Sequence, residues 1–152
     1  MKAKLVLFLL SICIISACVS GFGQKLYPVQ GPAAEQTPPP AFTARLTGTN
    51  SGNITLVQSN GETFIGRWAI VRPSFVDPDQ PGTPAGDPPQ PNLAAAWDVV
   101  YGQGYFLANV LGEPIGQAIV TGNQGTVLQL EFFNQHKGVA MDNKSNIYKI
   151  VW

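Results

Sequence analysis

The residues that could do chemistry in this chain are few and scattered. Asp98 and Glu131 each stand beside aromatic residues, and paired carboxylates are the groups with which glycosidases cut glycosidic bonds. Neighbouring residues on a strand face opposite sides, however, so Glu131 and Phe132 need not share a site. An enzyme acting on glycans through Asp98 or Glu131 therefore remains one alternative. The other is that Glu131 pairs with Arg67 on the outer face of a sheet.

The sequence gives little support for a metal-binding or nucleotide-binding site. His136 is the only histidine, whereas a zinc site uses three or four ligands. The acidic residues Asp77, Asp79 and Asp87 lack the glycine-centred spacing and closing glutamate of a calcium-binding loop. The glycine-containing stretch at 102–112 lacks the Lys-Ser/Thr end that grips phosphate. We expect no catalytic residue, no metal and no cofactor.

Charge excludes another class of partner. Nine Lys and Arg residues balance nine Asp and Glu residues, and Lys2 and Lys4 stand at the extreme N-terminus. Without those two lysines, seven basic residues face nine acidic ones. A protein that binds nucleic acid needs a basic face to offset phosphate charge. We therefore expect no nucleic-acid partner.

The N-terminus has the layout of an export signal. The basic head MKAK precedes the apolar run LVLFLLSICII and the small residues Ser16 and Ala17. This order predicts a secretory signal peptide over residues 1–17. The apolar run is shorter than the roughly 20 residues that span a bilayer, so a transmembrane helix is the weaker interpretation.

The end of this signal carries a more specific motif. Ile15-Ser16-Ala17-Cys18 resembles the lipobox of bacterial lipoproteins. The resemblance implies that Cys18 carries a thioether-linked diacylglycerol, that the signal is cut before it, and that the new amine is acylated. Because Val19 rather than Asp follows, it also implies the outer membrane of a Gram-negative cell, with the periplasmic or surface side left open. Cys13 leaves with the signal, so no disulfide is expected.

A tether is predicted after the anchor. Residues 18–41 contain several glycines and the run Pro38-Pro39-Pro40, and they show no helical or strand period. We expect a flexible Pro/Gly-rich spacer here; a polyproline ligand for a partner is the alternative. A second proline-rich stretch, residues 73–92, is expected to be a solvated loop.

From residue 42 onward, short alternating runs separated by turn residues predict strands. The expected strands are residues 41–47, 52–59, 62–72, 105–111, 115–121, 126–133, 139–142 and 147–152. Residues 93–101 fit either a helix or a strand, and three consecutive alanines favour a short helix. The domain of residues 42–152 is therefore predicted to be mainly β, a small antiparallel barrel or sandwich with at most one short helix.

The C-terminal half is also similar to small, uncharacterised envelope proteins of proteobacteria. The similarity rests on the segment 60–68 and on Gly122, Gly125, Thr126, Glu131, Phe132, Gly138, Ala140 and Tyr148. Some of those proteins carry cysteines near Leu130 and Ala140, which this chain lacks. The shared residues are of the kind that turns and strand packing require, and the resemblance implies no activity.

Aromatic residues are the remaining functional signal. Trp68, Trp97, Tyr101 and Tyr105 could form a binding surface that stacks on sugar rings or a protein partner, although core packing would use the same residues. We expect a lipid-anchored envelope lipoprotein that acts as a non-catalytic binding or assembly module. Its expected partners are the membrane, through lipidated Cys18, and an envelope protein or glycan. The alternatives are the glycan-acting enzyme and a purely structural envelope component.

Overall fold

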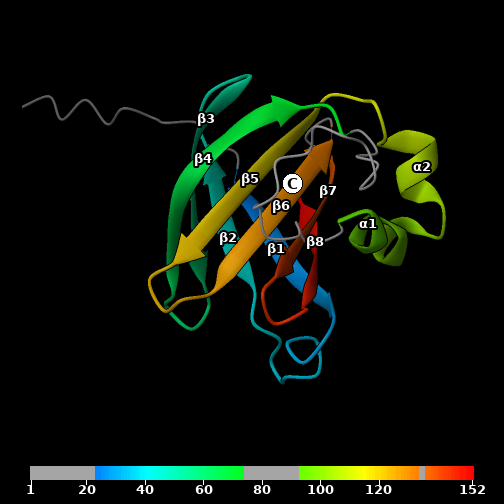
Figure 1. Cartoon of the computed structure of the whole chain (residues 1–152). Helices are drawn as coiled ribbons and strands as arrows, with labels where there is room; N and C mark the ends of the chain where they lie inside the picture. The colour runs from blue at the N-terminus through cyan, green and yellow to red at the C-terminus, as the bar shows by residue number, and fades with distance from the viewer. Residues whose placement is uncertain (1–22, 74–92, 134–135) are drawn as a thin grey trace, which may run out of the picture.

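The chain folds into one closed barrel of eight antiparallel strands (Figure 1). The computed structural model describes residues 23–73, 93–133 and 136–152, so the predicted signal, Cys18 and most of the proline-rich stretch lie outside it. Each strand pairs with its neighbour in sequence, and the last strand closes on the first. The strands are β1 (Gly23–Gln30), β2 (Phe42–Leu46), β3 (Ser51–Gln58), β4 (Thr63–Val71), β5 (Ile115–Gly122), β6 (Val127–Phe133), β7 (Lys137–Asp142) and β8 (Ile147–Val151). The predicted mainly β, antiparallel class is confirmed, and of the two architectures left open the structure has the barrel.

The barrel begins earlier than the sequence predicted. In β1, Leu26 pairs with Phe42 of β2 on one side and with Ile150 of β8 on the other. The flexible tether predicted for residues 18–41 is therefore wrong for residues 23–30. The strand tolerates Pro28 because the ladder with β8 shifts register between Pro28 and Gln30, and such irregularities accommodate a residue that cannot donate.

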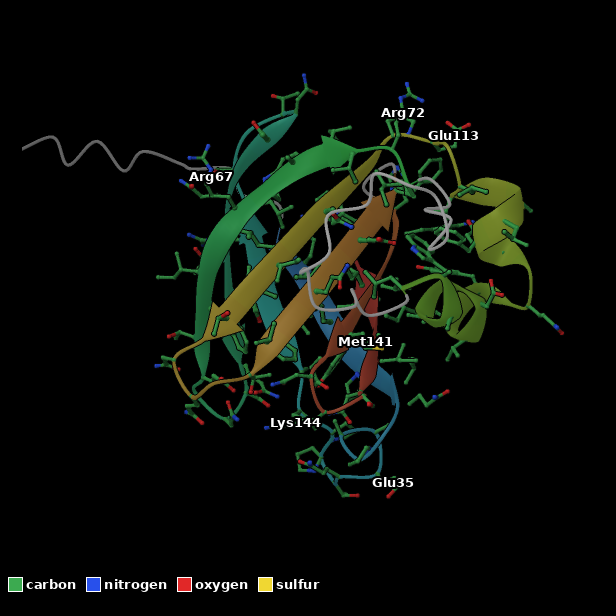
Figure 2. The ribbon with its side chains drawn as sticks, in the orientation of Figure 1. Glu35, Arg67, Arg72, Glu113, Met141 and Lys144 are labelled. Atoms are coloured by element: carbon green, nitrogen blue, oxygen red, sulfur yellow. The ribbon has the colours of Figure 1, made fainter. Side chains whose placement is uncertain are left out.

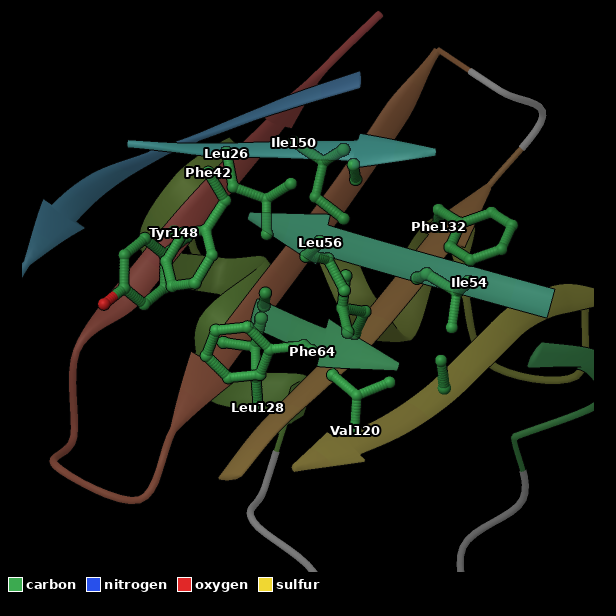
Figure 3. Close-up of a cluster of buried hydrophobic side chains, with 14 of the residues drawn as sticks. Leu26, Phe42, Ile54, Leu56, Phe64, Val120, Leu128, Phe132, Tyr148 and Ile150 are labelled. Atoms are coloured by element: carbon green, nitrogen blue, oxygen red, sulfur yellow. The ribbon is translucent and has the colours of Figure 1, made fainter. Parts of the chain in front are cut away.

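The inside of the barrel is filled with side chains. Inward residues alternate along each strand, and they include Leu26, Phe42, Leu56, Phe64 and Leu128, all at most 1% exposed (Figure 3). Small residues such as Ala44, Ala118 and Ala140 occupy inward positions between the large ones. Barrels of this size commonly fit their interior in this way. The interior is thus a packed core.

Two short helices lie against the outside of the barrel (Figure 1). α1 (Leu93–Tyr101) confirms the favoured helix, and its buried face, Leu93, Ala96 and Trp97, packs with Val139 and Ile147 of β7 and β8. α2 (Tyr105–Asn109) replaces the strand predicted at 105–111, so the structure has one helix more than expected. Among the described residues, no helix is long and apolar enough to cross a bilayer.

The second helix has a local cause. The backbone turns at Gly104, whose φ of 79° suits glycine. The carboxylate of Asp98 accepts hydrogen bonds from the Gly104 and Phe106 amides at 3.0 and 3.1 Å. Phe106 and Val110 are buried while Leu107 is 59% exposed, which is the four-residue repeat of a helix.

Candidate functional site

The four aromatic residues predicted as one binding surface lie in two places. Trp68 belongs to the core inside the barrel, whereas Trp97, Tyr101 and Tyr105 lie on the helices outside. Trp97 is 0% exposed, so it cannot stack on a ligand at the surface. Tyr101 and Tyr105 are half-buried and keep part of their rings in solvent.

Trp97 and Glu131 together fasten α1 to the barrel. The indole Nε1 of Trp97 donates to Oε2 of Glu131 at 2.8 Å, and Gln117 Nε2 donates to Oε1 at 3.2 Å. Burial raises the pKa of the Glu131 carboxyl, and these two hydrogen bonds oppose the rise. The predicted pairing with Arg67 is wrong, because Glu131 binds Trp97 and Gln117 and Arg67 points into solvent.

Asp98 likewise has a structural role, as the cap of α2. Its hydrogen bonds from the Gly104 and Phe106 amides hold the pKa of its carboxyl below the usual range. A carboxyl that stays ionised is poorly suited to protonate a leaving group. The contacts of Asp98 and Glu131 thus do not favour the glycan-acting enzyme.

Tyr101 and Tyr105 form an exposed cluster with two lysines. Lys137 Nζ donates to the Tyr105 hydroxyl at 3.0 Å and lies 5.0 Å from the centroid of that ring. Lys137 and Lys149 each lie 5.7 Å from the centroid of Tyr101. We call Tyr101, Tyr105, Lys137 and Lys149 the tyrosine–lysine cluster.

Contacts with β7 and with buried Trp97 fix the two tyrosines of the cluster in place. The Tyr101 hydroxyl accepts a hydrogen bond from the Gly138 amide at 3.0 Å and donates to its carbonyl at 3.3 Å. The Tyr105 ring stacks on buried Trp97, with centroids 5.9 Å apart. Hydrogen bonding to Tyr105 raises the pKa of Lys137, so this amine stays charged at neutral pH. Burial raises the pKa of Tyr101.

One end of the barrel, which we call the mouth, is open and aromatic. Phe132 lies between Trp68 and Trp152, at ring-centroid distances of 5.4 and 6.2 Å. The Trp68 indole donates to the Thr47 carbonyl at 2.9 Å. A pocket of about 470 Å³ opens here, which is within the size range of small-ligand sites. It is lined by Thr49, Asn50, Trp68, Ile70, Pro114, Gly116 and Phe132.

The opposite end is closed by a polar network. Asp142 accepts hydrogen bonds from the Tyr148 hydroxyl at 2.9 Å and from the Asn146 side chain at 2.8 Å. Asn146 Oδ1 in turn accepts from the Ala33 amide at 2.8 Å, which ties the segment after β1 to this end. Burial, followed by the charge of Asp142, raises the pKa of Tyr148 above its usual range. These buried groups satisfy one another, so we assign them to stability.

The other candidates of the sequence analysis lie elsewhere. His136 is exposed in the turn before β7. Within residues 23–73, 93–133 and 136–152, no three His, Cys, Asp or Glu side chains come close enough to hold a metal ion. Cys18 and the aspartates of the proline-rich stretch lie outside the described residues.

Sequence reasoning gave no binding role to Lys137, Lys149 and the mouth residues Ile70 and Phe132. The lysines stand at outward positions of β7 and β8. The docking of α1 against Gly138 brings the tyrosines to Lys137, and the pairing of Lys149 with Val139 brings Lys149 to the same place. An alternating pattern signalled that they face outward, but it carried no information about which helix covers those strands.

Comparisons with known proteins identify no relative of this chain. The chain matches no protein family, no curated protein and no solved structure. The two resemblances described from the sequence therefore stay predictions.

Proposed function

We propose that the protein is a lipid-anchored lipoprotein of the cell envelope, held in the outer membrane through Cys18, whose barrel is a non-catalytic binding module. The anchoring is supported by the basic head, the apolar run and the motif Ile15-Ser16-Ala17-Cys18. Each buried methylene of an acyl chain contributes roughly 0.8 kcal/mol, so two or three chains hold a protein durably.

The tyrosine–lysine cluster is the observation that carries the binding role. Among the described residues, neither Lys137 nor Lys149 is paired with a carboxylate, so both charges are free to meet a partner. Tyr27 of β1, 42% exposed, is the register partner of Lys149 and extends the aromatic surface. The surrounding rings hold the amines in place, which lowers the entropy lost on binding. Such a surface suits a partner that carries carboxylate or phosphate groups.

The partner class we favour is an acidic component of the envelope, a glycan or a protein segment. Hydrogen bonds between an ammonium and an anion are about twice as strong as neutral ones. Tyrosine rings beside the amines add contact area for a sugar or an apolar side chain. The surface therefore combines charge recognition with stacking.

The binding role is tested by comparing two single-lysine variants. Lys149→Gln removes a charge from the cluster, and Lys144→Gln removes one from the turn at the closed end. Binding of the purified protein to isolated envelope glycans and envelope proteins should weaken about tenfold for Lys149→Gln, since a hydrogen bond to a charged group contributes about 1.5–3 kcal/mol. Lys144→Gln should bind like the wild type. Equal losses in both variants would refute a specific role for the cluster.

The anchoring is tested separately in cells. A fatty-acid probe should label the wild type and leave Cys18→Ala unlabelled and released from the membrane. A Cys18→Ala protein that stays membrane-bound and is labelled like the wild type would refute the anchor.

A further inference from the structure

The barrel starts very close to the proposed lipid anchor. Gly23, the first residue of β1, lies five residues after Cys18. A chain spans at most roughly 3.3–3.6 Å per residue, so the two Cα atoms lie no more than about 18 Å apart. The predicted spacer of residues 18–41 would have placed the domain farther from the membrane. An anchored barrel must therefore sit at the bilayer surface.

The end of β1 that starts at Gly23 belongs to the mouth. Gly23 pairs with Arg45 near the end of β2, and Lys25 pairs with Val151 near the end of β8. Trp152, which follows Val151, contacts Phe132, and Phe132 lines the mouth pocket. The described chain therefore enters the barrel at the mouth, at the end opposite the closed polar one.

The chemistry of the mouth suits a lipid surface. Ile70 lines the pocket with 42% of its surface exposed, beside Trp68. Three exposed cations, Lys25, Arg45 and Arg72, surround this end, and their charges favour anionic headgroups. Figure 2 shows Arg72 and Glu113 at the mouth and Lys144 and Glu35 at the opposite end. Among the described residues of the rim, Glu113 is the acidic one.

We infer that the mouth of the barrel rests on the bilayer that holds Cys18, with exposed Ile70 at the interface and Lys25, Arg45 and Arg72 against lipid phosphates. This inference rests on the proposed anchoring. Tethering confers a high local concentration, so contacts that are weak in a free protein become populated. Long basic side chains prefer the membrane–water interface, where their apolar stems are buried and their charges reach the headgroups. The closed end then points away from the membrane, and the tyrosine–lysine cluster lies on the side wall of the barrel.

The orientation is tested on the lipidated protein in vesicles. The full chain, purified with its acylated Cys18, is inserted into vesicles of phosphatidylethanolamine with a minority of phosphatidylglycerol and a brominated lipid. Environment-sensitive fluorophores are attached at Ile70→Cys or, as the matched control, at Lys144→Cys. We expect the label at 70 to be quenched at least about threefold more than the label at 144, because interfacial contact brings it within reach of the bromines. Thr49→Cys, on the same rim, replaces Ile70→Cys if that variant does not fold.

A second pair of variants tests the charges. Arg45→Gln combined with Arg72→Gln should lower the quenching of the label at position 70, whereas Lys144→Gln should not. Equal quenching at both ends, or stronger quenching at 144, overturns the orientation while lipidation and vesicle flotation leave the anchor intact. Intact mass without a lipid and absence of flotation overturn the anchor, and the orientation with it.

Discussion

Replacing Gly116 tests how tightly the mouth is packed. A Cβ added at Gly116 would overlap Cε2 and Cζ of Phe132, far inside the usual carbon–carbon separation of about 3.5–4.0 Å. Phe132 cannot move freely, because its ring contacts Trp68 and Trp152. Overpacking costs about 1–3 kcal/mol, and the loss of glycine entropy in the unfolded chain returns about 0.4–1 kcal/mol. Gly116→Ala should therefore lower the free energy of unfolding by about 1–2 kcal/mol.

The assay is equilibrium denaturation followed by tryptophan fluorescence, with thermal unfolding beside it. For a domain of this size the loss corresponds to a fall in Tm of about 3–10 °C. Gly23→Ala is the matched control, because nothing lies within 4 Å of an added Cβ there. Without a clash it should leave stability unchanged or raise it by up to about 1 kcal/mol, through the same entropy term of the unfolded chain.

A compensating variant makes the reasoning refutable. Phe132→Leu removes the ring atoms that Cβ would meet, so Gly116→Ala should cost little in the Phe132→Leu background. The coupling in the double-mutant cycle should reach about 1 kcal/mol or more. If the two single losses simply add, the close approach of Phe132 to Gly116 is not what makes alanine unfavourable, and the packing argument fails.

Three further predictions concern buried hydrogen-bonding side chains. Glu131→Ala leaves the Trp97 indole without its partner and should cost about 1–3 kcal/mol by chemical denaturation; a loss below about 0.5 kcal/mol contradicts the fastening of α1. The raised pKa of Glu131 means that its contribution to stability is present below the ordinary glutamate pKa and is lost as pH rises through the raised value, so Glu131→Gln should flatten stability against pH in the acidic range. The raised pKa of Tyr148 means that its contribution is lost as pH rises above about 10, the ordinary tyrosine pKa. Tyr148→Phe should reduce that alkaline loss in a pH series of unfolding curves, and an unchanged alkaline limb would contradict it.

Much of the barrel could be predicted from local pattern, because alternation reports directly which residues face a core. The hairpin of β3 and β4 carries Asn60-Gly61, and the structure has positive φ at Gly61, as such turns require. β1 escaped prediction because polar Gln24 occupies an inward position and because proline, here Pro28, is a residue that strands usually exclude. α2 escaped because its start depends on Asp98, a side chain supplied by another helix.

The candidate site was harder to predict than the fold. Trp97, Tyr101 and Tyr105 were recognised as a group, but their different exposure follows from how α1 lies on the barrel. The roles of Lys137 and Lys149 depend on the register of β7 with β8. Register and helix docking are properties of the whole molecule, so residue spacing alone does not report them.

The pairing of β1 with β8 has a consequence for how this molecule reaches its folded form. In the closed barrel, β1 and β8 hydrogen-bond to each other. Without β8, the outer backbone N–H and C=O groups of β1 and of β7 would stay unpaired. The β1–β8 contacts join strands at opposite ends of the described sequence, and because non-local pairing slows folding, we expect closure of the barrel to be slow. A polypeptide delivered across a membrane from its N-terminus would wait with an exposed strand edge until β8 emerged. During that interval, a chaperone that covers the edge would prevent it from pairing with other chains.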